Sequence, residues 1–90
     1  MTLKMEINNI SDQLILITGG SGFLGKQLAL KLSIKNKVIL ASRNNYLSQQ
    51  ASDETNCEIT PLDVTNIESV RDSLTKYKPD IVIHTAATKY

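Results

Sequence analysis

Short apolar runs alternate with longer amphipathic segments along the chain, and this alternation predicts parallel strands joined by helices. The strands are expected at residues 14–18, 38–41, 58–62 and 81–84. The first run is apolar at successive positions, as in a central strand that is covered on both faces. Pro61 lacks a backbone donor, which favours an edge position or a strand end for the third run.

Two of the intervening segments have apolar side chains at helical spacing. Leu24, Leu28 and Leu32 predict a helix from residue 23 to about residue 33, with this stripe packed on the sheet. A second helix is predicted to end before the proline at position 79. Its apolar positions are Ile67, Val70, Leu74 and Tyr77, and Thr65 and Glu68 are expected to form its capping box.

The remaining segments give weaker patterns. Residues 44–56 are polar and poorly periodic, which predicts at most one short helical turn. Residues 1–13 are expected to be an irregular lead-in, and residues 14–90 one half-domain. Right-handed crossovers place the strands in the order 3-2-1-4, so the fold class is α/β, the first part of a Rossmann doubly wound parallel sheet. Because the fourth strand would then be an unpaired edge, we expect the chain to be a fragment.

The glycine-rich segment Thr18–Gly25 directly follows the first predicted strand and opens the first helix. Gly19 and Gly20 allow a sharp turn with backbone angles that disfavour a side chain. Gly22 would let a diphosphate approach the backbone, and Gly25 would let the helix pack closely on the strand. The amides of the first helical turn would then face the anion, so the segment predicts a dinucleotide site.

Two alternatives to this interpretation remain open. One is a glycine turn without any ligand. The other is a P-loop, because residues 20–26 also fit G-x-x-x-x-G-K. Gln27 argues against the P-loop, since an amide replaces the hydroxyl that would bind magnesium there.

Composition narrows the possible partners and compartment. Ten basic and nine acidic residues among 90 give a net charge of +1, which gives no electrostatic basis for binding nucleic acid or an anionic membrane. Cys57 is the only cysteine, so the sequence predicts no internal disulfide and no cysteine-cluster metal site. A reducing, cytoplasmic location is expected, and the apolar runs are too short for a transmembrane helix or a secretory signal.

Three motifs together resemble the extended branch of the short-chain dehydrogenase/reductase superfamily, which contains NAD-dependent epimerases and dehydratases. They are the segments 18–25, 62–65 and 80–87. Residues 86–90 look most like polysaccharide-biosynthesis enzymes that act on UDP-N-acetylglucosamine-type sugars. The resemblance implies transient oxidation of the sugar and return of the hydride from the same cofactor, in a parent protein whose oligomeric state stays open.

The resemblance also implies which residues contact the cofactor. They are Thr18, Gly19, Gly20, Ser21, Gly22, Phe23, Leu24, Gly25, Ser42, Arg43, Asn44, Asp63, Val64, Thr85, Ala86 and Ala87. In relatives that bind NAD, an acidic residue some 18 positions after the last glycine contacts the ribose 2′-hydroxyl. Arg43 takes that place here, and a guanidinium favours the 2′-phosphate of NADP over NAD. The alternative for Arg43 is a solvated cation at a strand end.

Two other polar residues have competing interpretations. Asp63 would accept a hydrogen bond from the adenine amino group with help from the Val64 backbone, or else belong to the cap of the following helix. His84 is the only histidine, and we interpret it as a structural support for the loop after the fourth strand rather than as a catalytic group.

The resemblance sets a limit on what the chain does alone. The superfamily uses a Tyr-x-x-x-Lys pair, and no tyrosine in this sequence has lysine four residues later. We therefore expect these 90 residues to bind cofactor weakly or not at all and to catalyse nothing. The alternative function is a non-catalytic NADP-binding redox sensor or scaffold of the same fold.

Overall fold

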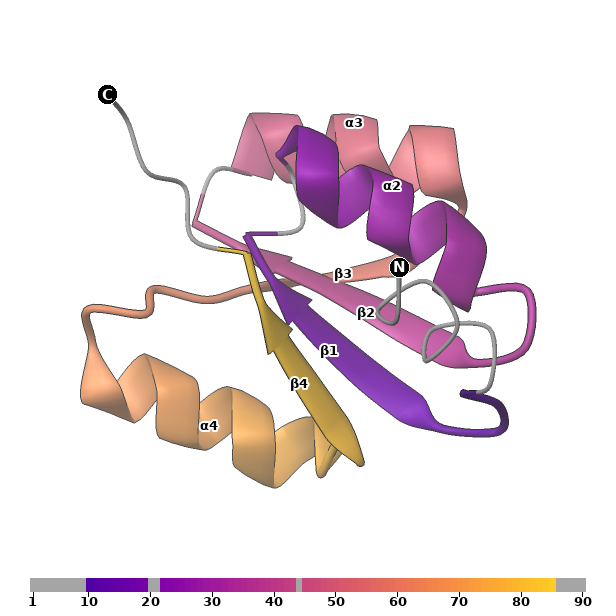
Figure 1. The fold of residues 1–90 in the computed structure, drawn as a ribbon. Coiled ribbons are helices and arrows are strands. Elements are labelled where there is room, and N and C mark those ends of the chain that lie inside the picture. The colour runs from indigo at the N-terminus through magenta and orange to yellow at the C-terminus, as the bar shows by residue number, and fades with distance from the viewer. Residues whose placement is uncertain (1–9, 20–21, 44, 86–90) are drawn as a thin grey trace.

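A sheet of four parallel strands carries helices on both faces (Figure 1). The computed structural model describes residues 10–19, 22–43 and 45–85, and for residues 45–48 it describes the backbone only. The strands are β1 (Leu14–Thr18), β2 (Lys37–Ser42), β3 (Glu58–Pro61) and β4 (Ile81–His84), and the helices are α2 (Phe23–Leu32), α3 (Asn45–Thr55) and α4 (Ile67–Tyr77). The strand order is β3-β2-β1-β4, which confirms the predicted class and topology.

The central strand β1 pairs with β2 on one side and β4 on the other. Ile17 lies opposite Leu40 of β2 and Ile83 of β4. Since successive side chains of a strand point to opposite faces, Ile15 and Ile17 pack with α2 and α3, whereas Leu16 packs on the side of α4. Both faces of β1 are therefore buried, as the continuous apolar run predicted.

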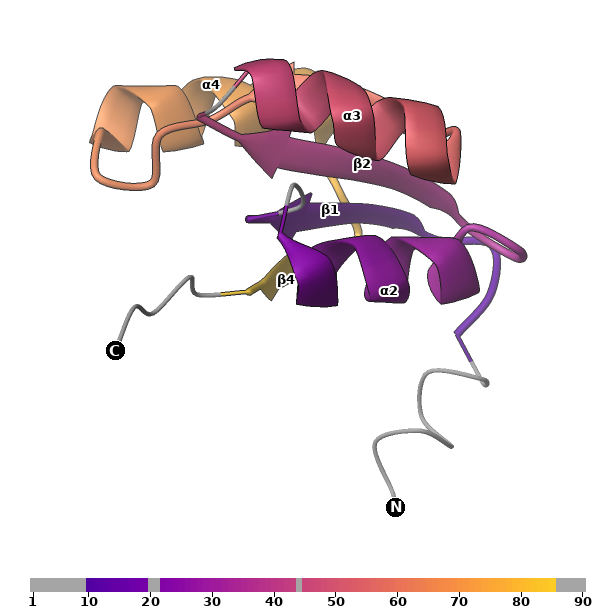
Figure 2. The ribbon, with the colours of Figure 1, turned by 90° about the horizontal axis from the view of Figure 1, so that it is seen from above.

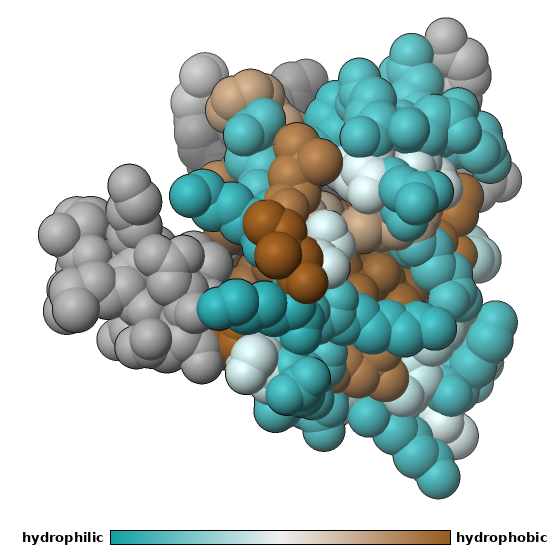
Figure 3. All heavy atoms as spheres, turned by 90° about the vertical axis from the view of Figure 1, so that its right-hand side faces the viewer, coloured by the Kyte–Doolittle hydropathy of each residue, from teal (hydrophilic) through white to brown (hydrophobic). Residues whose placement is uncertain are grey.

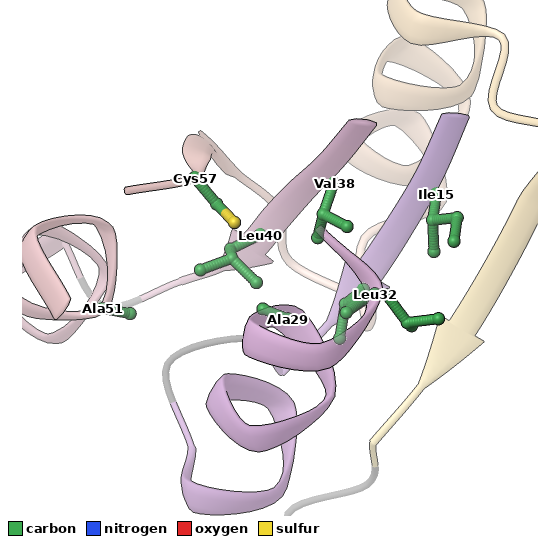
Figure 4. Packing of buried hydrophobic residues seen from close by; sticks show 8 residues of the cluster. Ile15, Ala29, Leu32, Val38, Leu40, Ala51 and Cys57 are labelled. Carbon is green, nitrogen blue, oxygen red and sulfur yellow. The ribbon is translucent and has the colours of Figure 1, made fainter. Parts of the chain in front are cut away.

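The two faces of the sheet have separate hydrophobic cores. Helices α2 and α3 cover one face and α4 covers the other (Figures 1 and 2). The first core contains Ile15, Ile17, Ala29, Leu32, Val38, Leu40, Ala51 and Cys57, most of them drawn in Figure 4. The second contains Leu16, Ile39, Ala41 and Leu62, with Val70 and Tyr77 of α4 packed against it. The lone cysteine thus lies in a core, as a free and buried thiol.

The prediction for residues 44–56 was wrong, because this segment forms the eleven-residue helix α3. Ala51 is completely buried against the sheet, and the Thr55 hydroxyl donates to the Ala51 carbonyl. A salt bridge from Lys26 of α2 to Glu54 adds a contact between the two helices. Of the side chains described in α3, the buried ones are the small Ala51 and the polar Thr55, which give no apolar stripe, and this is why the periodicity missed the helix.

The predicted apolar stripe of α2 was also partly wrong. The helix buries Gly25, Ala29 and Leu32, whereas Leu24 is 58% exposed. Small residues at positions 25 and 29 let the helix approach the sheet closely, and this moves the larger leucine to the surface. Figure 3 shows that other apolar groups, in brown, are also exposed among hydrophilic side chains on the side of the molecule at the right of Figure 1.

Helix α4 begins differently from the prediction. Its N-cap is Asn66, whose side chain accepts hydrogen bonds from the amides of Glu68 and Ser69. The expected capping box between Thr65 and Glu68 does not form, because the Thr65 hydroxyl instead donates to the Asp63 carboxylate. The helix ends before Pro79 as predicted, and Lys78 adopts the left-handed conformation at its C-cap.

Element boundaries otherwise agree with the sequence to within a residue or two. Strand β3 is an edge strand that ends at Pro61, as its missing donor predicted. On α4, Val70 and Tyr77 contact the core, but Ile67 and Leu74 are exposed. No helix in the described ranges is long and apolar enough to cross a membrane.

Candidate cofactor-binding site

The carboxyl ends of the strands meet at one edge of the sheet, and those predicted site residues that the structure describes lie there. The chain leaves β1, turns through the glycine segment and enters α2 at this edge (Figure 1). Because β1 lies between β2 and β4, this turn stands where the winding direction of the sheet reverses. Ligands of open α/β sheets bind at such a switch point.

Gly19 requires glycine for two independent reasons. Its φ of +74° lies in the left-handed region that side chains disfavour, as predicted. In addition, a Cβ atom at this position would lie 2.5 Å from Thr85 Oγ1 and closer still to the Thr85 carbonyl oxygen. The second reason depends on the contact between the ends of β1 and β4, which nothing in the local sequence indicates.

No contact with the described residues requires glycine at position 22. Its φ of −81° and ψ of 170° are extended angles that any residue adopts. Of the atoms that the structure describes, an added Cβ would meet the Gly19 carbonyl oxygen alone, at an ordinary van der Waals distance of 3.4 Å. A bare backbone with open space beside it fits the close approach of a diphosphate.

The amino end of α2 has unused backbone donors. The first intrahelical bond runs from the Lys26 amide to the Gly22 carbonyl, so the amides of residues 23–25 have no acceptor within the helix. Within α2 no side chain caps this end and its first turn has no acidic residue. The Gly22 amide is different, because it donates to the Gly19 carbonyl at 3.0 Å. Three donors and the positive end of the helix dipole therefore fit an anionic group.

The P-loop interpretation does not fit the position of its lysine. The Lys26 ammonium lies 2.8 Å from Glu54 Oε1 of α3. A P-loop lysine must instead reach the phosphates over the turn. Lys26 therefore contributes to the packing of α2 on α3.

Arg43 and Asp63 lie together at the ends of β2 and β3. Both line a groove of about 620 Å³ between β3 and α4, which also has Ser69 and Lys76 in its wall. The Arg43 side chain is exposed, and its positive charge is one of the causes that lower the pKa of Asp63. A cation and a hydrogen-bond acceptor thus border the same groove.

Asp63 organises the loop before α4. Its Oδ1 atom accepts from the Thr65 hydroxyl at 2.6 Å and from the Thr65 amide at 2.9 Å. These two bonds are the largest causes of its lowered pKa, ahead of the charge of Arg43. The alternative that Asp63 belongs to the cap of the helix is therefore wrong, because Asn66 caps α4 and Asp63 orders the loop before it. An additional contact to adenine remains a prediction.

Four other predicted residues are placed around this edge. Ser42 is buried and accepts a backbone hydrogen bond from Leu62, and Val64 is exposed in the loop before α4. Thr18 and His84 share a side-chain hydrogen bond across β1 and β4, in agreement with a structural role for the histidine. The predicted contacts Gly20, Ser21, Asn44, Ala86 and Ala87 lie outside the described residues.

Comparison of the sequence with known proteins also indicates a family of NAD-dependent enzymes. Residues 15–90 match the family model described as the NAD-dependent epimerase/dehydratase family. The chain is 36% identical to a dTDP-D-glucose 4,6-dehydratase of Dictyostelium discoideum, covering 90% of this chain and 21% of that protein. It is 38% identical to a GDP-6-deoxy-D-talose 4-dehydrogenase of Aggregatibacter actinomycetemcomitans, covering 84% of this chain and 21% of that protein.

The solved structures support the fold. A short-chain dehydrogenase/reductase from Mycobacterium ulcerans superposes with a TM-score of 0.74 at 24% identity, over 90% of this chain and 34% of that one. The chain spans about a fifth of the length of the curated relatives it matches. With the family model matching most of its residues and the strand order in agreement, the chain belongs to the NAD-dependent epimerase/dehydratase family.

Proposed function

We propose that this chain is the cofactor-binding part of an enzyme that converts a nucleotide sugar, with NADP as the preferred cofactor. The observation that carries the proposal is the bare amino end of α2, where open space at Gly22 adjoins three backbone donors. The diphosphate of the cofactor would lie against these donors. When bound, the cofactor accepts and returns a hydride at a sugar carbon.

The preference for NADP rests on Arg43. It directly follows β2 and borders the groove with Asp63, where the adenosine end of the cofactor would lie. The predicted position of a ribose-binding carboxylate thus holds a guanidinium, which can form paired hydrogen bonds to a 2′-phosphate. Asp63 would accept a hydrogen bond from the adenine amino group, because its carboxylate can accept more hydrogen bonds than the two from Thr65.

The relatives support a nucleotide sugar as the substrate class, and the sequence of this chain supports a particular kind of nucleotide sugar. Both curated relatives carry a nucleotide sugar in their names, one a dTDP-linked and one a GDP-linked hexose. The segment Ala86–Tyr90 favours a UDP-N-acetylhexosamine, used in polysaccharide or glycan synthesis.

We further propose a cytoplasmic location, consistent with the free thiol of Cys57. Since the sequence has no Tyr-x-x-x-Lys pair, these 90 residues alone are expected to convert no sugar.

The test compares Arg43→Asp with wild type in fluorescence titrations of the complete protein with NADPH and NADH. We expect the dissociation constant for NADPH to rise about 10- to 100-fold, the loss of a charge-assisted contact, and that for NADH to change less than about threefold. Lys37→Asp is the matched control, because Lys37 is an exposed cation at the opposite end of the same strand. Equal losses for both cofactors would contradict the role of Arg43, and no binding of either by wild type would contradict the proposed function.

A further inference from the structure

Thr85 follows β4 directly and is buried against the start of the glycine turn. We infer that its hydroxyl is a positioning group, which fixes the Gly19 carbonyl and thereby the direction of the amides at the amino end of α2. The consequence for cofactor affinity rests on the proposed function, whereas the effect on the turn does not. The resemblance implied that Thr85 contacts the cofactor and gave its hydroxyl no part in the glycine turn.

The hydroxyl joins two elements that are far apart in the sequence. Thr85 Oγ1 lies 2.7 Å from the Thr18 carbonyl oxygen and 3.1 Å from the Gly19 carbonyl oxygen. A hydroxyl has one hydrogen, so the two carbonyls share it. The Thr85 amide also donates to the Thr18 carbonyl at 3.0 Å. The end of β4 therefore binds the last residue of β1 and the first residue of the turn.

The Gly19 carbonyl transmits this contact to α2. It accepts from the Thr85 hydroxyl on one side and from the Gly22 amide at 3.0 Å on the other. Gly22 is the N-cap of α2, so the position of the Gly19 oxygen sets the place where the helix begins. The same contact orients the Gly22 backbone and the three amides of residues 23–25, which have no acceptor within the helix.

Close packing leaves the turn little freedom to compensate. A Cβ at Gly19 would be 2.5 Å from Thr85 Oγ1, which shows how tightly the two segments approach. Without the hydroxyl, the half-buried Gly19 carbonyl would keep its bond to the Gly22 amide as its remaining contact among the described residues, and the turn would sample other orientations. A diphosphate would then bind a turn that must first be ordered.

The experiment compares Thr85→Ala with Thr85→Ser in the complete protein, because these two variants differ only by the hydroxyl. The readout is amide hydrogen exchange of Gly22, measured by NMR relative to the Leu40 amide in the core. We expect Thr85→Ala to accelerate exchange at Gly22 about tenfold without a matching change at Leu40, and Thr85→Ser to resemble wild type. Thr75→Ala, on the exposed surface of α4, is the matched control and should change neither amide.

Two results would overturn the inference. One is equal acceleration at Gly22 and Leu40 in Thr85→Ala, which would indicate a general loss of stability. The other is the same exchange behaviour in Thr85→Ala and Thr85→Ser, which would show that the hydroxyl has no part in the effect. If Thr85→Ala does not fold, Thr85→Val serves as the second variant without a hydroxyl and is compared with Thr85→Ser in the same way.

Titration with NADPH separates this inference from the proposed function. Thr85→Ala should raise the dissociation constant for NADPH about five- to tenfold and leave that for adenosine 2′-monophosphate unchanged, because the latter has no diphosphate. Equal weakening of both ligands would overturn the link to the diphosphate site. Absence of NADPH binding by wild type would overturn the proposed function, while exchange at Gly22 would still decide the role of Thr85.

Discussion

The amino ends of α2 and α4 lie at the same edge of the sheet but differ in how they are capped. At α4, Asn66 accepts from the amides of Glu68 and Ser69, and the acidic Glu68 lies in the first turn. At α2, the N-cap is Gly22, and its first turn has neither a capping side chain nor an acidic residue. Among the described residues, a side chain of the protein caps the amino end of α4, whereas none caps the amino end of α2.

This difference has a cost in stability. A capping side chain typically stabilises a helix by about 1 kcal/mol relative to alanine, but only by a few tenths of a kcal/mol relative to glycine, which is the N-cap of α2. A functional site often retains such a local deficit, because the group that would remove it would also occupy the place of the ligand. Variants at the two helix ends can therefore be compared in stability and in cofactor affinity.

The largest effect is expected when α2 is given the cap that α4 already has. Gly22→Asp supplies a capping carboxylate at extended backbone angles, and we expect the free energy of unfolding to rise by about 0.5 kcal/mol. The dissociation constant for NADPH should rise at least about 100-fold, because the carboxylate repels the diphosphate. Urea unfolding and fluorescence titration measure the two quantities.

Gly22→Asn is the control for charge in this experiment, since it has nearly the same shape as Asp and also caps a helix. It should stabilise the fold similarly and weaken NADPH binding less than Gly22→Asp does. An unchanged affinity in Gly22→Asp would show that the open space at Gly22 is not part of the site.

A smaller effect is expected when the cap of α4 is removed. Asn66→Ala eliminates the acceptor for the amides of Glu68 and Ser69, so the free energy of unfolding should fall by about 1 kcal/mol. Asn66→Ser keeps a capping oxygen and should remain close to wild type. Equal stability of the alanine and serine variants in urea unfolding would indicate that solvent satisfies this helix end as well as Asn66 does.

The smallest effect concerns the dependence of stability on pH at the loop before α4. Hydrogen bonds from Thr65 and the charge of Arg43 lower the pKa of Asp63, so its carboxylate favours the folded state. This stabilisation is present above the ordinary pKa of an aspartate, about 3.9, and is lost as the pH falls through the lower pKa of the folded state.

Asp63→Asn provides the comparison, because asparagine keeps an acceptor for Thr65 without the titrating proton. Wild type should be more stable than the variant at pH 6, and the difference should shrink as the pH falls toward 3. Urea unfolding at a series of pH values measures the difference. A constant difference between the two proteins would contradict the assignment of the effect to ionisation of Asp63.

The sequence was sufficient for the order of the sheet and for most of its elements. The continuous apolar run of β1 is buried on both faces, and Pro61 ends an edge strand. The reason is that parallel sheets have strong local signals, and the handedness of the crossovers leaves few ways to arrange them. The glycine segment was identified from sequence for a similar reason, because the conformation of Gly19 is a local property of the backbone.

Tertiary packing decided what the local patterns could not. Helix α3 packs on the sheet with the small Ala51 completely buried, and the exposure of Leu24 depends on the close approach of α2 to the sheet. The Thr85 hydroxyl reaches the Gly19 carbonyl only because β4 pairs with β1 across more than sixty positions of sequence. Such contacts arise from the register of distant segments, which no local spacing of residues encodes.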